Sequence, residues 1–378
     1  MGMLRTLRRG VTWTALALAG GAVVVTVRHL LESPQPLQSA LNGTAYIDRA
    51  HGGEMYYNVA GPVDAAPIVL LHDFSPGASN FAYRDVFGRL ASANRVYAPD
   101  WLGYGMSERP NIAYTGEFYA NVLVGFLRDV VAAPSTVVGL GRAANVVVRA
   151  ASDAPRLFSR VVLVSPDITA GAQAEPTLAQ TLVRATQRAF LGIVPYAVVS
   201  TRPVLRYLSA RGRERREAGD GAAPSDEALD QRYASAHQFG GQYAPLAMLT
   251  GELDLPVRNA FALLEPPALV VIGAEDRQRP AVEVAEWTGV NPRADLEVIP
   301  DAGYDVPGDQ PRAFVTALDR WLETLPPALG GVPLSGSDRS ESATESDMPG
   351  LPGYVVPGVS DMGLEGPAAV TIGGITTM

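Results

Sequence analysis

The sequence contains no cysteine among its 378 residues. Disulfides, thiolate nucleophiles and cysteine-ligated metal sites are therefore excluded. The absence of cysteine does not indicate a compartment, because a cysteine-free domain tolerates both oxidising and reducing environments. Histidine is also scarce, because the chain holds only four: His29, His51, His72 and His237. The sequence shows no metal-ligand cluster, phosphate-binding loop or dinucleotide fingerprint. We therefore expect no metal and no cofactor, and few candidates for the histidine base that most hydrolytic enzymes use.

Positive charge is in short supply. The chain has 30 lysines and arginines against 39 acids, and its formal net charge is −9. Nucleic-acid-binding proteins usually carry a basic surface, so we expect no nucleic acid partner. The deficit is concentrated at the C-terminus, where residues 328–378 contain one arginine and six acids, a net charge of −5. The rest of the chain is closer to neutral.

One apolar run stands out at the N-terminus. Arginines in the basic segment of residues 1–10 precede an uncharged run, Val11–Val27. Its length is near the lower limit for a bilayer-spanning helix, roughly 17–25 residues. A cleaved signal peptide is the alternative, but the Val-Arg-His-Leu-Leu-Glu sequence that follows is a poor cleavage context. We therefore favour a single-pass transmembrane anchor over residues 11–31, with the lipid bilayer as partner. The preceding arginines predict a cytoplasmic N-terminus and a domain on the outer face.

Short apolar strands alternate with helical patterns over residues 44–325. This alternation predicts an α/β domain with a mostly parallel sheet of eight strands and helices on both faces. The first two strands read as a hairpin joined at Gly52-Gly53. The strands are expected at 44–49, 54–60, 67–72, 95–100, 134–139, 160–165, 268–273 and 296–300. The helices are expected at 84–91, 118–131, 142–152, 281–288 and 311–325.

Two segments depart from this alternation. Residues 170–264 are helix-prone, which predicts a helical cap over the carboxyl ends of the strands, where α/β sheets bind ligands. Residues 326–378 are rich in Gly, Pro, Ser and acids, a composition typical of a disordered tail. The end of this tail, residues 348–378, regains Val, Ile and Met. The alternative interpretation is that this end of the tail is a docking peptide for a protein partner.

Several motifs occur in the order and spacing of a known superfamily. Leu71-His72-Asp73-Phe74 resembles the His-Gly-aromatic turn of α/β-hydrolases, and the segment 100–107 (DWLGYGMS) resembles their Asp-x-x-Gly-x-Gly-x-Ser loop. The strand ends at 273–277 and 298–304 resemble those that carry the acid and the histidine of the catalytic triad. The resemblance implies a capped α/β-hydrolase fold. In the cap, residues 236–243 are similar to an uncharacterised bacterial branch of the superfamily.

The departures from the family pattern fall on the triad. The nucleophile elbow, G-x-S-x-G in the family, reads Gly139-Leu-Gly-Arg-Ala143 here, so that Gly141 replaces the serine. Glycine adopts strained backbone conformations without a Cβ clash, so the turn can persist without the nucleophile. Tyr304 stands at the histidine position, and a phenol with an unperturbed pKa of about 10 is a poor base at neutral pH. Asp276 remains at the acid position without an imidazole to orient.

The resemblance also implies where an oxyanion hole would form. Its donors would be the backbone N–H of Arg142 and that of Asp73 or Phe74. Asp73 replaces a glycine of the family, and its carboxylate would repel a developing oxyanion unless it points away. We expect the neighbouring His72 to brace the turn rather than to catalyse.

Two further residues are possible substitutes for the missing triad groups. His237 lies in the cap segment and could act as a base, although a surface or packing role is favoured. Asp167 follows the strand at 160–165, where some family members carry the acid, but a turn or helix-capping role is equally consistent with the sequence.

Three functions follow from this combination. The first is a membrane-anchored pseudoenzyme that binds a small apolar ligand or a protein partner. The second is an active hydrolase or lyase of the same superfamily with a non-standard active site. The third is an accessory subunit of a membrane complex that uses the anchor and the tail as attachment points.

Overall fold

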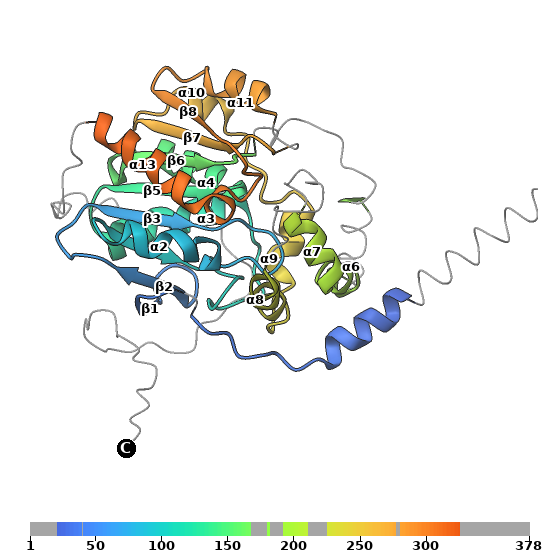
Figure 1. Ribbon diagram of the computed structural model, residues 1–378. Helices are drawn as coiled ribbons and strands as arrows, with labels where there is room; N and C mark the ends of the chain where they lie inside the picture. Colours follow the sequence, from blue (N-terminus) through green and yellow to red (C-terminus); the bar gives the residue numbers. More distant parts are fainter. Residues whose placement is uncertain are drawn as a thin grey trace, which may run out of the picture.

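A computed structural model describes residues 21–39, 41–167, 180–181, 192–210, 225–276 and 280–325. Figure 1 shows one central sheet with helices on both of its faces. The sheet has eight strands in the order β1-β2-β4-β3-β5-β6-β7-β8. The strands are β1 Thr44–Asp48, β2 Met55–Ala60, β3 Pro67–Leu71, β4 Arg95–Pro99, β5 Ser135–Leu140, β6 Phe158–Val164, β7 Ala268–Gly273 and β8 Ala294–Ile299.

Strand direction follows the sequence pattern. β2 pairs antiparallel with β1 and β4, and the pairs from β4 through β8 are parallel. β3, β5 and β7 are buried along their whole length. That burial is expected of parallel strands covered by helices on both faces. The predicted eight-stranded, mostly parallel sheet is confirmed.

Alternate residues of the strands supply two separate apolar cores. Val137 and Val270 belong to one core, whereas their neighbours Val138 and Leu269 belong to the other. This division follows from the two-residue period of a strand. The first core also contains apolar residues of α3 (Gly116–Phe126), α4 (Arg142–Asp153) and α11 (Ala281–Thr288). The second contains those of α2 (Arg84–Leu90), α12 (Val306–Asp309) and α13 (Pro311–Thr324).

The helix predicted over residues 118–131 has different bounds in the structure. α3 starts at Gly116, because the side chain of Thr115 caps it by accepting the Phe118 N–H at 3.0 Å. After Phe126 the chain makes a π-helical turn, η2 (Leu127–Val131), and leaves it at Ala132 with a φ of 55°. Shorter 3₁₀ turns, η1 and η3, occur at Asn80–Tyr83 and Pro155–Leu157.

A histidine joins the first hairpin to this π-helical turn. His51 Nδ1 lies 2.6 Å from Asp48 Oδ2, and its Nε2 lies 3.0 Å from Asp129 Oδ2. Burial opposes the charged imidazolium, but the two carboxylates outweigh burial and raise the pKa of His51. The ring packs so closely on α3 that a Cβ added to Gly125 would lie 2.1 Å from its Cδ2.

Helices between β6 and β7 gather at one end of the sheet (Figure 1). They contact the loops that follow the parallel strands: Gly77 after β3 approaches Arg232, and Gly103 after β4 approaches Ala244. These helices therefore lie over the carboxyl ends of the strands. The described ones there are α6 (Ile193–Val199), α7 (Arg202–Ala210), α8 (Asp226–Ala236) and α9 (Tyr243–Leu249). α10 (Arg258–Ala262) also comes between β6 and β7 in the chain but lies beside α11 (Figure 1), where Phe261 stacks on Trp287.

The chain enters the domain through a helical segment and an extended one. Residues 21–31 are helical, and residues 33–39 then run across the cap towards β1 (Figure 1). None of the described helices has the length and apolarity needed to cross a membrane. The first part of the run Val11–Val27 and the tail of residues 326–378 lie outside the described residues.

Candidate functional site

The turn between β5 and α4 has the geometry of a nucleophile elbow. β5 ends at Leu140, α4 begins at Arg142, and Gly141 joins them with φ 64° and ψ −126°. A positive φ of this size is strained for any residue with a Cβ, and glycine adopts it freely. The strand–turn–helix is thus retained, while its apex carries no side chain.

The space above the apex is occupied by Tyr304. A Cβ built on Gly141 would lie 1.7 Å from the Tyr304 hydroxyl oxygen and 2.7 Å from Asp73 Oδ1. Tyr304 is held from behind, because the Ser165 hydroxyl donates to its backbone oxygen at 2.8 Å. The phenol therefore fills the place from which a nucleophile's side chain would extend. Substitution of a serine there would require the tyrosine to move.

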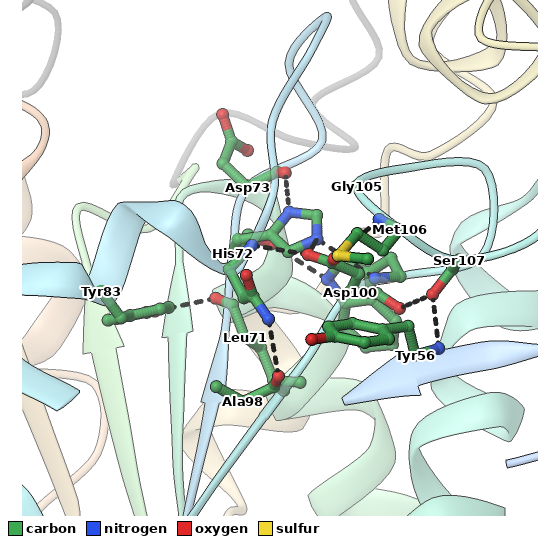
Figure 2. A network of polar contacts seen from close by, with 12 residues as sticks. Tyr56, Leu71, His72, Asp73, Tyr83, Ala98, Asp100, Gly105, Met106 and Ser107 are labelled. Atoms are coloured by element: carbon green, nitrogen blue, oxygen red, sulfur yellow. Dashed lines mark hydrogen bonds and ion pairs between the residues drawn. The ribbon is translucent and has the colours of Figure 1, made fainter. Parts of the chain in front are cut away.

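The elbow's backbone donor is also occupied. The Arg142 N–H, which in an active elbow faces the oxyanion, donates to Asp73 Oδ1 at 3.2 Å. Figure 2 shows the Asp73 side chain turned away from the His72 ring. The Asp73 carboxylate thus points into the oxyanion-hole region and supplies an anion of its own. A negative charge at this point disfavours a second one on a reacting carbonyl oxygen.

His72 braces the turn after β3 through both ring nitrogens (Figure 2). Its Nδ1 donates to the Asp73 backbone oxygen at 2.7 Å, and its Nε2 accepts the Trp101 N–H at 3.1 Å. The ring is fully buried, and burial lowers the pKa of His72. This neutral imidazole is committed to backbone groups. Phe74 is also fully buried in this region, stacked on Trp101.

The loop at 100–107 is held by the buried carboxylate of Asp100. Its Oδ1 accepts the Asn80 N–H at 2.6 Å, and its Oδ2 accepts the Met106 N–H at 2.8 Å. Ser107 completes the loop by donating its hydroxyl to the Asp100 backbone oxygen at 2.6 Å (Figure 2). Burial raises the pKa of Asp100. The motif positions the backbone beside the site and leaves its carboxylate engaged in the loop.

The Arg142 side chain connects the elbow to the cap. Its Nε donates to Asp254 Oδ1 at 3.1 Å, its Nη2 lies 3.5 Å from Asp167 Oδ2, and its Nη1 contacts the Met248 sulfur. Burial lowers the pKa of Arg142, but the carboxylates of Asp167, Asp254 and Asp73 outweigh it and raise the pKa. Asp167 therefore serves as an ion-pair partner, and Arg142 links α4, the end of β6 and the cap.

Asp276 and His237 are not among the residues that line the cavity above the elbow. Asp276 is buried, 4% exposed, where the chain leaves β7, and its N–H donates to the Gly273 oxygen at 3.2 Å. His237 stacks on Tyr233 with 3.9 Å between ring centroids and lies outside the residues that line the cavity above the elbow. The structure thus brings together Gly141, Tyr304, Asp73 and Arg142.

A cavity of about 580 Å³ lies above the elbow. This volume is within the range of small-molecule sites, roughly 300–1,000 Å³. Asp73, Arg142 and Tyr304 line it beside the elbow. The cap contributes apolar residues, Val199, Val204, Leu208, Ala228, Met248 and Leu249, and also polar ones, Gln180, Ser209, Ser225, Gln231 and Arg232. A ligand would therefore meet polar groups beside the elbow and both apolar and polar groups beneath the cap.

Arg232 is a cavity residue that the sequence did not reveal. It projects from α8, where its Nε donates to the Pro76 oxygen at 2.9 Å and its Nη1 to the Ser209 hydroxyl at 2.8 Å. Burial lowers the pKa of Arg232, opposed by the negative charge of Asp73. No motif marks this arginine, because the charge of one helical residue does not tell whether it faces solvent or a cavity.

Residues 68–317 match the sequence profile described as "Alpha/beta hydrolase family". An uncharacterised protein of Mycobacterium tuberculosis is 24% identical over 314 residues, which cover 78% of this chain and 85% of the relative. The 2-hydroxy-6-oxo-2,4-heptadienoate hydrolase of Pseudomonas putida is 25% identical over 273 residues, 68% of this chain and 88% of the relative.

Solved structures show the same fold. A serine hydrolase involved in carbazole degradation (CarC) superposes with a TM-score of 0.60 at 22% identity, and covers 75% of this chain and 100% of its own. The epoxide hydrolase CorEH also gives a TM-score of 0.60, at 20% identity, and covers 75% of this chain and 99% of its own.

Proposed function

The chain belongs to the α/β-hydrolase family, and from that premise we propose that it is a membrane-anchored pseudoenzyme. In this proposal it binds a small, largely apolar ligand or a protein partner where its relatives carry out chemistry. The observation that carries the proposal is the Tyr304 hydroxyl, 1.7 Å from where a Cβ on Gly141 would stand.

Three requirements of serine-hydrolase chemistry are unmet at this site: the nucleophile, the base and a free oxyanion donor. Nucleophilic catalysis needs a hydroxyl at the elbow and a base beside it, but Gly141 has no side chain and Tyr304 is a phenol. Stabilisation of the oxyanion needs free N–H donors, but the Arg142 N–H is bonded to the Asp73 carboxylate. Because three separate parts are altered, restoring one of them would not restore catalysis.

The cavity supports retention of ligand binding. It is large enough for a small molecule, and its cap side is lined by apolar residues such as Val199, Val204 and Leu208. Apolar surface of this kind favours an apolar ligand. Arg232 and Tyr304 would contact a polar group on that ligand, since both line the cavity.

The proposed membrane anchor comprises residues 11–31, with the N-terminus in the cytoplasm and the domain on the outer face. The apolar run Val11–Val27 behind three arginines supports it. The helix of residues 21–31 also exposes large apolar side chains, including Val24 at 68% and Leu31 at 79%. The test is extraction of membranes with alkaline carbonate. The full chain should stay in the pellet, whereas a mature N-terminus after Leu31 would indicate a cleaved signal peptide.

An active hydrolase or lyase with a non-standard site is the second candidate. The Tyr304 hydroxyl over the elbow, close to the Asp73 carboxylate, is the observation that favours it. The heptadienoate hydrolase similar to this chain is an enzyme of the same family. In this alternative, Tyr304 would act as an acid or a nucleophile.

Hydrolysis of short acyl esters by the purified full chain distinguishes the two candidates. A pseudoenzyme should turn them over barely above buffer, and Tyr304→Phe should leave that rate unchanged. Turnover that disappears in Tyr304→Phe would favour the active enzyme. An accessory role in a membrane complex is compatible with the first candidate, with the tail of residues 326–378 as an attachment point for a protein partner.

A further inference from the structure

The end of the proposed anchor and the segment that follows it dock on the cap. His29 lies edge-on to Tyr196 of α6, with 5.6 Å between ring centroids, and 4.6 Å from the ring of His237 at the end of α8. Glu32 accepts a hydrogen bond from the Tyr233 hydroxyl at 2.7 Å. These contacts fix the cap directly beside the end of the N-terminal helix.

The extended segment continues the contact. The side chains of Gln238 and Gln231 donate to the backbone oxygens of Gln35 and Gln38. The segment therefore crosses α8 and its C-terminal loop before it enters β1. Because both the helix and the extended segment are bonded to the cap, the cap has a defined position relative to the anchor.

The contacts with the N-terminal helix determine how far the cap lies from the hydrocarbon layer of the bilayer. If the hydrocarbon layer ends near Val27, an α-helical rise of 1.5 Å per residue puts His29 about 3 Å beyond it and Glu32 about 7 Å beyond it. The headgroup layer extends roughly 5–8 Å on each side of the hydrocarbon. The cap residues that touch His29 and Glu32 therefore lie at the depth of the lipid headgroups.

Exposed apolar side chains occur on the cap next to these contacts. Phe239 follows Gln238 in the α8–α9 loop and is 84% exposed. Val198 lies in α6 on the side away from Tyr196 and is 39% exposed. Aromatic side chains are enriched at membrane interfaces, where one end of the residue is apolar and the other is wet. The nearby Arg202 is paired with Asp230, so this face presents apolar groups with little net charge.

We propose that the cap is a second membrane-contacting element, in which Phe239 and Val198 insert among the lipid headgroups beside the anchor. The proposal rests on the membrane anchoring proposed above and is independent of whether the site is catalytic. It also places the cavity close to the bilayer, because α6 and α8 supply both the docking residues and cavity residues such as Val199 and Arg232.

The absence of cysteine makes a direct test available, since one introduced cysteine reports on one position. Phe239→Cys is labelled with an environment-sensitive fluorophore in the full chain, reconstituted in phosphatidylcholine vesicles that contain a headgroup nitroxide lipid. Val198→Cys repeats the test on α6. Val282→Cys on α11 and Val63→Cys between β2 and β3 are matched controls, because these valines are 71% and 76% exposed.

The expected result is several-fold stronger quenching by the nitroxide lipid at Phe239 and Val198 than at the two control positions. Equal quenching at all four positions in vesicle-bound protein would overturn the proposal. So would a label at Phe239 that is shielded from aqueous iodide but not quenched by lipid, because it would indicate contact with a protein. Failure of the chain to float with vesicles would overturn both the anchor and this proposal, and would leave the pseudoenzyme reading intact.

Discussion

The Tyr304 hydroxyl oxygen lies 1.7 Å from the point that a Cβ atom on Gly141 would occupy. The two residues are 163 positions apart in the sequence. Gly141 directly follows β5, and Tyr304 lies in the loop after β8. A serine at the elbow would clash with the phenol unless the tyrosine moved. The two departures from the family pattern are therefore in direct contact, and Tyr304 occupies the space that a side chain at position 141 would need.

Gly141→Ala should destabilise the protein by about 1–3 kcal/mol, because a Cβ would meet Tyr304 at a strained positive φ. Gly88→Ala is the matched control. Gly88 lies in α2 with nothing within 4 Å of an added Cβ, so alanine should be neutral or stabilising there. Thermal unfolding of both variants checks this. Equal midpoints for the two alanines would show that Tyr304 does not fill the elbow.

Ester hydrolysis should require three changes together: Gly141→Ser, Tyr304→His and Asp73→Gly. The first two supply a nucleophile and a base, and the third frees the Arg142 N–H that Asp73 now occupies. Groups that act as a unit are strongly non-additive, so the single variants should stay near buffer. Initial rates with a short acyl ester measure this. Robust hydrolysis by Gly141→Ser alone would contradict the proposed blockage of the site.

The contacts of His51 with Asp48 and Asp129 should stabilise the fold most at mildly acidic pH. Its pKa is raised, so its contribution is complete below the unfolded-state value of about 6.5 and is lost as the pH rises through the higher folded-state value. His51→Gln should therefore cost roughly 0.5–1 kcal/mol near pH 6 and less at alkaline pH. Urea unfolding of variant and parent at two pH values measures the difference. A larger cost at alkaline pH would mean that the imidazole is not charged.

Arg142→Met should loosen the cap. It would leave Asp254 and Asp167 without their shared partner, at a cost of about 1–3 kcal/mol. Arg149→Met on the same helix is the control, because its exposed pairs with Asp153 and Glu117 should be worth under about 1 kcal/mol. Limited proteolysis within the cap reports the loosening. Equal cleavage of the two variants would argue that Arg142 does not hold the cap.

The sequence was sufficient to predict the sheet and the elbow. The apolar runs of β3 and β5 mark buried parallel strands, and the small residues at 139, 141 and 143 preserve the turn. The direction of Asp73 and the position of Tyr304 over Gly141 could not be predicted, because both depend on side-chain conformation where distant loops meet. Arg232 was missed for the same reason: its role depends on the packing of α8 over the loop after β3.

The most direct test of the central claim is labelling of the unmodified full chain by a fluorophosphonate probe, with the adduct mapped by mass spectrometry. We expect no adduct on any residue that lines the cavity, because Gly141 offers no hydroxyl and a phenol is a weak nucleophile at neutral pH. Stoichiometric labelling of Tyr304, or of another residue in this cavity, would contradict the pseudoenzyme proposal and favour the active enzyme with a non-standard site.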